Sequence, residues 1–231
     1  MRLVVVSGTS GSGKTSVLLH TIRELKSKEL NCGVVKIDCL QTDDLRRFKK
    51  EGIPVKVGIS GDMCPDHFAI FNFDEMIEWG LDKQITIVET AGLCLRCTPY
   101  TDKCLAVCVI DVTSGPNMPL KIGPMLTTAD IVILTKGDLV SQAEREVFRE
   151  KTHEVNKTCR IIDANGLSGM GAAELADLIE DFKIDVDIEM KLRHTPPLSV
   201  CTICTGETRT SKKFHIGVLK HLNGFSEYVG E

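Results

Sequence analysis

The sequence predicts a three-layer α/β fold, in which a mainly parallel sheet is covered by helices on both faces. Short apolar runs rich in β-branched residues alternate with helix-like segments along the chain, the pattern of strand–helix–strand units. A glycine-rich loop joins the first run to the first helix-like segment, as in sheets that carry a phosphate-binding P-loop. The 231 residues are enough for one large domain with an appendage.

The first half of the chain contains four of the apolar runs, and helix-like segments follow most of them. Strands are expected at residues 2–7, 32–38, 55–59 and 84–89. Helices are expected at residues 14–28, 42–51 and 73–79. Because a helix between two strands lets both strands run in the same direction, this half predicts parallel pairing.

The chain between residues 105 and 182 continues the alternation of strands and helices. Strands are expected at residues 105–112, 131–135 and 160–163, and helices near 121–127, at 141–155 and at 171–182. In the last helix the apolar residues Ala172, Leu175, Ala176 and Ile179 are three or four positions apart. That spacing is typical of a helix face that packs on a sheet.

The pattern changes after residue 182, where acidic and apolar residues alternate up to a Pro196-Pro197 pair. The change predicts a boundary near Asp187, with a P-loop domain at 1–187 and a small extension at 188–231. This extension contains Cys201 and Cys204 with two residues between them. The pair needs further ligands, such as His194 or His215, to form a metal site, and its role stays open.

Composition excludes several kinds of partner. The 28 Lys and Arg against 32 Asp and Glu leave no basic excess, so nucleic acid is not expected to bind. The longest apolar stretch, residues 3–6, is far shorter than the ~20 residues that cross a bilayer, so no membrane partner is expected. The N-terminus shows no secretory signal, and we therefore expect a cytoplasmic protein.

The strongest motif is Gly8-Thr-Ser-Gly-Ser-Gly-Lys-Thr15, which matches G-x-x-x-x-G-K-[ST] between a strand and a helix. Its glycines allow successive N–H groups to face a phosphate. Lys14 is expected to reach the β and γ phosphates, and the Thr15 hydroxyl to bind Mg²⁺. The expected nucleotide contacts in this loop are Gly8, Ser10, Gly11, Ser12, Gly13, Lys14, Thr15 and Ser16.

Carboxylates at the ends of later strands are expected to complete the hydrolytic site. Glu89 ends the 84–89 strand, and Gly92 follows it with a backbone N–H that can sense a γ phosphate. Asp38 ends the 32–38 strand and Asp44 follows closely, so both are expected to hold the metal ion or its waters. Lys14, Asp38, Asp44 and Glu89 are the predicted catalytic residues.

The nucleotide base is predicted from Thr135-Lys136-Gly137-Asp138, at the end of a buried strand. The Asp138 carboxylate can accept hydrogen bonds from both N1–H and the amino group of guanine. Adenine lacks this donor pair and would leave the carboxylate badly paired. Thr135, Lys136 and Asp138 therefore favour GTP over ATP.

Six of the ten cysteines are in polar or Gly/Pro-rich stretches, unlike Cys32, Cys39, Cys108 and Cys159, which have the apolar neighbours of a small hydrophobic residue. Cys94 and Cys97 follow Gly92, and Cys64 is three residues before His67. These four residues can form a Cys/His site for Ni²⁺ or Zn²⁺, within one chain or across a dimer, and Cys104 is a further candidate. Inert packing and a redox pair remain alternatives for Cys94 and Cys97.

These residues resemble the metal-chaperone GTPases of nickel enzyme maturation, typified by the hydrogenase accessory protein HypB and the urease accessory protein UreG. The resemblance covers roughly residues 1–182 and is carried by residues 8–15, 38–44, Glu89, 111–121 and 135–138. It implies a homodimer that binds and slowly hydrolyses GTP and in which nucleotide state controls delivery of a metal, expected to be nickel, to a client metalloenzyme or its maturation factors.

Two features depart from this family and leave alternatives open. The base motif has Thr135 where the family has Asn, and Cys64 and His67 are separated where the family has an adjacent Cys-His pair. A GTPase that escorts a cobalamin-dependent or other cofactor enzyme, with incidental cysteines, remains an alternative. So does a thiol or Fe–S electron-transfer protein that uses nucleotide to time transfer.

Overall fold

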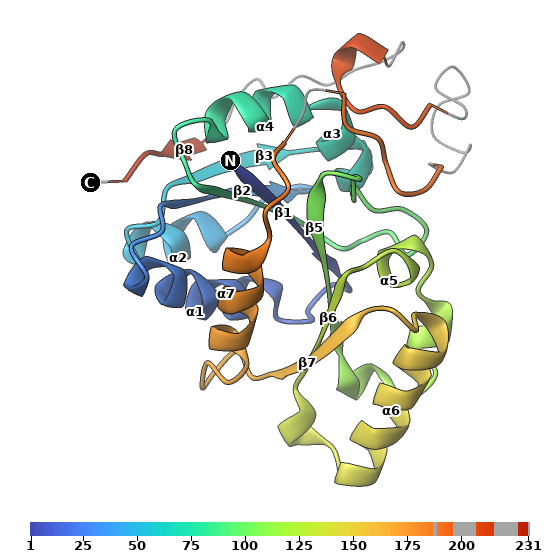
Figure 1. Ribbon diagram of the computed structural model, residues 1–231. Coiled ribbons are helices and arrows are strands. Elements are labelled where there is room, and N and C mark those ends of the chain that lie inside the picture. Colours follow the sequence, from blue (N-terminus) through green and yellow to red (C-terminus); the bar gives the residue numbers. More distant parts are fainter. Residues whose placement is uncertain (187–188, 196–206, 215–225, 231) are drawn as a thin grey trace.

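A computed structural model describes residues 1–186, 189–195, 207–214 and 226–230. In it an eight-stranded sheet has the order β7-β6-β5-β1-β4-β2-β3-β8 (Figure 1). The strands are β1 (Arg2–Gly8), β2 (Cys32–Asp38), β3 (Val55–Ile59), β4 (Ile85–Thr90), β5 (Cys104–Asp111), β6 (Ile131–Thr135), β7 (Arg160–Ala164) and β8 (Ser226–Tyr228). The first seven are parallel, and only β8 is antiparallel. The predicted α/β fold is confirmed.

Seven α-helices connect these strands within the described residues. They are α1 (Lys14–Ser27), α2 (Asp44–Lys50), α3 (Pro65–Phe71), α4 (Phe73–Gly80), α5 (Pro124–Thr127), α6 (Gln142–Val155) and α7 (Ala172–Asp181). Four 3₁₀ turns lie at Val112–Ser114, Pro119–Lys121, Gly137–Leu139 and Lys212–Phe214. Helix α3 is absent from the sequence prediction. None of the described helices has both the length and the apolar composition to cross a bilayer.

Alternation along the strands produces a separate core on each side of the sheet. In β1, Val4 and Val6 belong to the core beneath α1 and α7, whereas Leu3 and Val5 face the opposite core, formed with α3, α4, α5 and α6. Successive strand residues point to opposite faces, so a strand covered on both sides is apolar at every position. Since these strands are parallel, their carboxyl ends all meet at one edge, where the functional side chains gather.

The extension returns to the P-loop domain. Strand β8 pairs with the edge strand β3, with Tyr228 opposite Val55, and Trp79 Nε1 donates a 2.6 Å hydrogen bond to Glu227. Met190, nearer the start of the extension, is fully buried in the core beneath α3 and α4. Asp187, where we expect the boundary, lies outside the described residues, and so do Cys201, Cys204 and His215.

Candidate functional site

The glycine loop packs directly against its neighbours between β1 and α1. A Cβ atom on Gly8 would lie 2.2 Å from the carbonyl oxygen of Val109 in the adjacent strand, so the position admits no side chain. Gly11 and Gly13 have φ angles of 72° and 85°, in the left-handed region that glycine adopts without strain. The loop therefore takes a conformation that its sequence makes accessible.

Lys14 lies within this loop. Its Nζ donates hydrogen bonds to the carbonyl oxygens of Gly8 and Thr9, at 3.1 and 3.0 Å, and approaches the carbonyl of Ala91 at 3.4 Å. Burial lowers the pKa of Lys14 despite the nearby Glu89 carboxylate. A Cβ atom on Gly92 would lie 1.7 Å from the Gly8 carbonyl oxygen, so the chain after β4 packs directly on the phosphate loop.

The Thr15 hydroxyl meets two of the predicted carboxylates. Thr15 Oγ1 is 2.7 Å from Glu89 Oε1 and 2.9 Å from Asp44 Oδ2. Glu89 is fully buried, and its Oε2 has no hydrogen-bond partner among the described residues. Mg²⁺ prefers such hard oxygen ligands. The residues present therefore fit a magnesium ion, with Asp38 at the neighbouring end of β2.

Lys36 completes this group and was missed by the sequence prediction. It lies opposite Glu89 in the register of β2 and β4. Its Nζ is 2.7 Å from Glu89 Oε1, 2.9 Å from Asp44 Oδ2 and 4.0 Å from Asp38 Oδ2. Burial acts to lower the pKa of Lys36, but Glu89 and Asp44 raise it above its ordinary value. The sequence did contain a signal for Lys36, because it is a charged residue within an otherwise apolar strand. It is also two positions before Asp38 and therefore on the same face of that strand as Asp38.

Two cavities lie along the carboxyl edge of the sheet. One of about 310 Å³ is lined by the phosphate loop together with Lys36, Asp38, Asp44 and Glu89. The other, of about 410 Å³, is lined by Asp138 and by residues of α6 and of the loop after β7. The two cavities are lined by different elements, the first by the phosphate loop and the second by Asp138, α6 and the loop after β7.

The base motif contacts the phosphate loop directly. Thr135 Oγ1 donates to the carbonyl of Ser12 at 2.7 Å. Lys136 Nζ donates to the carbonyl of Gly11 at 2.9 Å. Asp138 lies in the wall of the second cavity, where its Oδ1 accepts a 3.1 Å hydrogen bond from Asn165 Nδ2. The motif thus links the wall of the second cavity to the phosphate loop.

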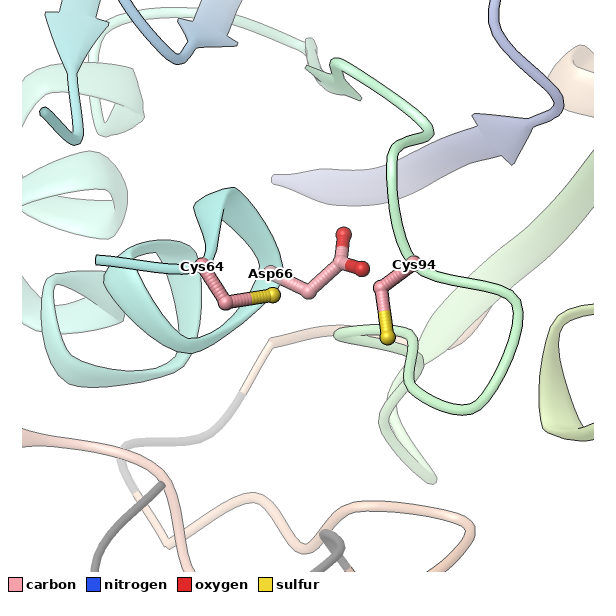
Figure 2. A group of neighbouring side chains, drawn as sticks. All are labelled: Cys64, Asp66 and Cys94. Carbon is pink, nitrogen blue, oxygen red and sulfur yellow. The ribbon is translucent and has the colours of Figure 1, made fainter. Parts of the chain in front are cut away.

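A second cluster contains Cys64, Asp66 and Cys94 (Figure 2). Cys64 precedes α3, Asp66 lies in the first turn of α3, and Cys94 is in the loop after β4. One ligand atom from each lies within 4.8 Å of the other two. Asp66 is 2% exposed, and its Oδ1 has no hydrogen-bond partner in the described part of the chain. Burial raises the pKa of Asp66 to about 7 and that of Cys64 to about 11.

Asp66 was not among the predicted ligands, although Cys64-Pro65-Asp66 contains a signal for it. Proline in the first turn followed by an acidic residue is typical of a helix start, and α3 begins at Pro65. A short helix there turns Asp66 back towards Cys64. The prediction placed no helix in this stretch and grouped Cys64 with His67, Cys94 and Cys97 instead.

The other cysteine and histidine candidates lie beside this cluster rather than in it. Cys97 is fully buried and packs with Ile70, Phe71 and Leu192, and burial raises its pKa. The His67 ring is 6.4 Å from the Phe71 ring. Neither His67 nor Cys97 belongs to the group of ligand atoms found among the described residues. Their role as ligands stays a prediction.

Hydroxyl groups connect the two sites beneath the phosphate loop. Ser7 Oγ, at the end of β1, is hydrogen-bonded to Thr90 Oγ1 at 3.2 Å and to Thr98 Oγ1 at 3.0 Å. The interaction of Thr90 with the Asp66 carboxyl acts to lower the pKa of Asp66, in opposition to burial. Polar contacts through Thr90 thus connect the phosphate-loop strand with the cysteine cluster.

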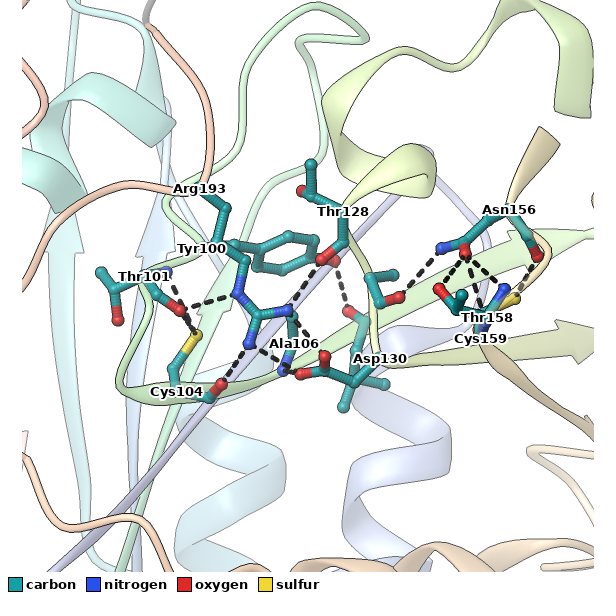
Figure 3. A network of polar contacts seen from close by, with 12 residues as sticks. Tyr100, Thr101, Cys104, Ala106, Thr128, Asp130, Asn156, Thr158, Cys159 and Arg193 are labelled. Atoms are coloured by element: carbon teal, nitrogen blue, oxygen red, sulfur yellow. Dashed lines mark hydrogen bonds and ion pairs between the residues drawn. The ribbon is translucent and has the colours of Figure 1, made fainter.

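Arg193 of the extension holds the end of the loop between β4 and β5, the loop that contains Cys94 (Figure 3). Its guanidinium makes two hydrogen bonds to Asp130, at 2.7 and 2.9 Å. It also donates to the carbonyl oxygens of Thr101 and Cys104, both at 2.8 Å. Cys104 is itself fully buried at the start of β5. These contacts of Arg193 hold the loop in place where it leads into β5.

Comparison with known proteins identifies the family of the chain. Residues 2–163 match the family model described as CobW/HypB/UreG, nucleotide-binding domain. The chain belongs to the CobW/HypB/UreG family. The resemblance noted from the sequence is therefore confirmed over most of the chain.

Relatives in the CobW/HypB/UreG family differ in how much of this chain they match. An uncharacterized protein of Methanocaldococcus jannaschii is 59% identical over all of both chains. The urease accessory protein UreG of Trichodesmium erythraeum is 28% identical and covers 75% of this chain and 88% of its own. The structure of HypB from Helicobacter pylori in complex with nickel has a TM-score of 0.64 at 21% identity, with 81% of this chain and 91% of that chain covered. At this sequence identity, the structural likeness concerns the fold alone.

Proposed function

We propose that the protein is a GTP-binding and GTP-hydrolysing metallochaperone that couples nucleotide state to delivery of a metal ion into a client metalloenzyme. One observation carries the proposal. Gly92 packs on the phosphate loop, and Cys94 of the thiol–carboxylate cluster is two residues further along the same loop. A nucleotide that moves this loop therefore moves a metal ligand.

The phosphate cavity supports nucleotide hydrolysis. Lys14 carries the positive charge for the β and γ phosphates, and Ser10, Gly11 and Gly13 of the glycine loop line the same cavity. Thr15, Asp44 and Glu89 would hold Mg²⁺, which neutralises charge that develops on the phosphate oxygens. Asp38 is the more solvent-accessible carboxylate of the group and would orient the attacking water.

The base cavity supports guanine as the base. Asp138 presents a carboxylate at its wall, and the two oxygens can accept from N1–H and from the amino group of guanine. Asn165, which already donates to Asp138, keeps one oxygen oriented. With adenine, the carboxylate would face an acceptor nitrogen and lose a hydrogen bond.

The metal cargo is expected to be a borderline ion, Ni²⁺ or Zn²⁺, because the cluster offers two sulfur ligands and one carboxylate oxygen. Nickel is favoured because the structure of HypB from Helicobacter pylori, which shares this fold, was solved in complex with nickel. Three ligands from one chain leave a coordination position for a second copy of this chain or for the client. That open position suits an ion that must be passed on in the cytoplasm.

The test is the metal affinity of the purified protein with GDP and with a non-hydrolysable GTP analogue. We expect the two affinities to differ by roughly 5- to 150-fold, the range of coupling between linked sites. Metal should change the affinity for the analogue by the same factor, because the coupling is reciprocal. Equal metal affinities in the two nucleotide states would contradict the coupling.

Cysteine variants provide the control for this experiment. Cys64→Ser should weaken metal binding and remove its dependence on nucleotide. Cys159→Ser should change neither, because Cys159 is half-buried elsewhere, with its thiol on the carbonyl of Asn156. A wild-type protein that hydrolyses GTP but binds no transition metal would instead favour the escort of a cofactor-bound enzyme.

A further inference from the structure

The phosphate cavity contains an ammonium group that the proposed function does not use. Lys36 is 4% exposed, and its Nζ makes close contacts with Glu89 and Asp44. A buried lysine is rare unless it is paired. Here three carboxylates, those of Asp38, Asp44 and Glu89, lie within 4.0 Å of the same nitrogen.

The atoms that contact Lys36 are the atoms expected to serve Mg²⁺. Glu89 Oε1 is 2.7 Å from both Lys36 Nζ and Thr15 Oγ1. Asp44 Oδ2 is 2.9 Å from each of the same two atoms. The ammonium and the hydroxyl thus share both carboxylate oxygens. A divalent ion bound by Thr15 and either oxygen would lie close to the ammonium, and like charges at such separations repel strongly in a partly desolvated site.

Backbone register explains why this contact cannot be avoided by a small movement. Lys36 and Glu89 are opposed in neighbouring parallel strands, so both side chains leave the same face of the sheet. Asp44 is held near them by Arg47, whose Nη1 donates to Asp44 Oδ1 at 3.0 Å. The cavity that contains the ammonium is also lined by Gly11 and Lys14 of the phosphate loop.

We propose that Lys36 is an internal counter-ion that competes with Mg²⁺ for Glu89 and Asp44, so that the divalent ion binds well only together with a nucleotide. The phosphate oxygens of the nucleotide are the anions in this cavity that can accept the displaced ammonium. Lys36 is thereby a positioning residue that links magnesium binding to triphosphate binding. The inference rests on the proposed function for its nucleotide, but the competition itself concerns this chain's own residues.

The first test measures thermal unfolding and Mg²⁺ binding without nucleotide. Lys36→Met should lower the Tm in the absence of divalent ions, because it leaves Glu89 buried without its cation. Mg²⁺ should restore much of this loss in Lys36→Met and should change the wild-type Tm little. We expect the affinity for Mg²⁺, measured by equilibrium dialysis, to rise at least roughly tenfold in the variant, given the repulsion between like charges a few ångströms apart.

Two further variants keep the test decisive. Lys36→Gln retains a hydrogen-bond donor but removes the charge, and it should show the same gain in Mg²⁺ affinity if Lys36→Met does not fold. Lys83→Met removes another buried lysine, one that contacts Asp82 and the carbonyl of Trp79 away from this cavity. It should leave the Mg²⁺ dependence at the wild-type level. Equal Mg²⁺ affinities in wild type and both Lys36 variants would overturn the proposal.

A nucleotide arm separates this proposal from the proposed function. In wild type, GTP should strengthen Mg²⁺ binding more than it does in Lys36→Gln, since only wild type has an ammonium to displace. If wild-type protein binds no guanine nucleotide, the proposed function fails, whereas the dialysis result without nucleotide still decides the competition. If wild type binds GTP and Lys36 variants bind Mg²⁺ no better, only the counter-ion assignment fails.

Discussion

Glu89 of the magnesium group (Thr15, Lys36, Asp38, Asp44 and Glu89) is five residues before Cys94 of the cysteine cluster, yet the two groups accommodate buried charge in opposite ways. At the magnesium group, internal cations match the carboxylates, and Lys36 lowers the pKa of Asp44 although burial acts the other way. At the cluster, burial dominates and raises the pKa of both Asp66 and Cys64. In the first region Lys36 favours the charged form of Asp44, whereas in the second the raised pKa values of Asp66 and Cys64 mean that metal binding has to displace their protons.

The largest effect that tests this contrast is expected from Lys14→Ala. The substitution removes the charge assigned to the β and γ phosphates and should reduce GTP hydrolysis by about 10³-fold, the upper range for loss of one transition-state donor. Metal affinity of the cluster without nucleotide should change little. Phosphate release and metal titration measure the two quantities. Lys28→Ala, which removes an exposed ion pair with Glu180, is the control. Near-normal GTP hydrolysis in Lys14→Ala would contradict the assignment of this cavity to the phosphates.

The next effect is the pH dependence of stability that Asp66 contributes. Its pKa is about 7 in the folded protein and near 3.8 when unperturbed, so between these values the folded state binds more protons than the unfolded state. Its contribution is fully present below about pH 4 and is lost as the pH rises to about 7. Asp66→Asn should therefore gain roughly 4 kcal/mol relative to wild type between pH 4 and 8. Urea unfolding in the presence of a chelator measures the free energy of unfolding of both proteins across this pH range. If the two pH profiles run parallel, the pKa of Asp66 is not raised in the folded protein.

A smaller effect is expected at Asp138, where hydrogen bonds to the base, and not buried charge, decide which nucleotide binds. Asp138→Asn replaces a double acceptor with an amide and should reduce the preference for GTP over ATP by roughly 10- to 100-fold. Competition binding of the two nucleotides provides the measurement. Asp163→Asn, in the same cavity wall but paired with Arg149, should keep the preference. A wild type that favours ATP would refute the base assignment.

The smallest effect concerns the connection between the two regions. Thr90→Val keeps the shape of the side chain but removes the hydroxyl that joins Ser7 to Asp66. We expect the nucleotide dependence of metal affinity to fall by about 5-fold, near the lower limit of coupling between sites, with hydrolysis retained. Thr98→Val also loses a bond to Ser7 but has no bond to Asp66 in the described structure, so it serves as the matched control. Equal losses in both variants would indicate general destabilisation.

Sequence patterns predicted what is local and missed what depends on tertiary placement. The seven parallel strands and the loop at residues 8–15 are encoded in consecutive residues, so their prediction needed no knowledge of the fold. Lys36 meets Glu89 only through strand register, and Arg193 meets Asp130 only after the extension folds back. Asp66 was missed because a helix of one to two turns, α3, has too few residues for a periodic apolar pattern.

Strand β8 also has a consequence for the time at which the sheet is completed. Its partner β3 ends at Ile59, whereas β8 begins at Ser226, so most of the chain must be synthesised between them. At roughly 5–20 residues per second, ribosomes need on the order of ten to thirty seconds for that interval. During this time the unpaired N–H and C=O groups of β3 are open to pairing with another chain. A strand synthesised long after β3 thus covers the edge that β3 leaves open.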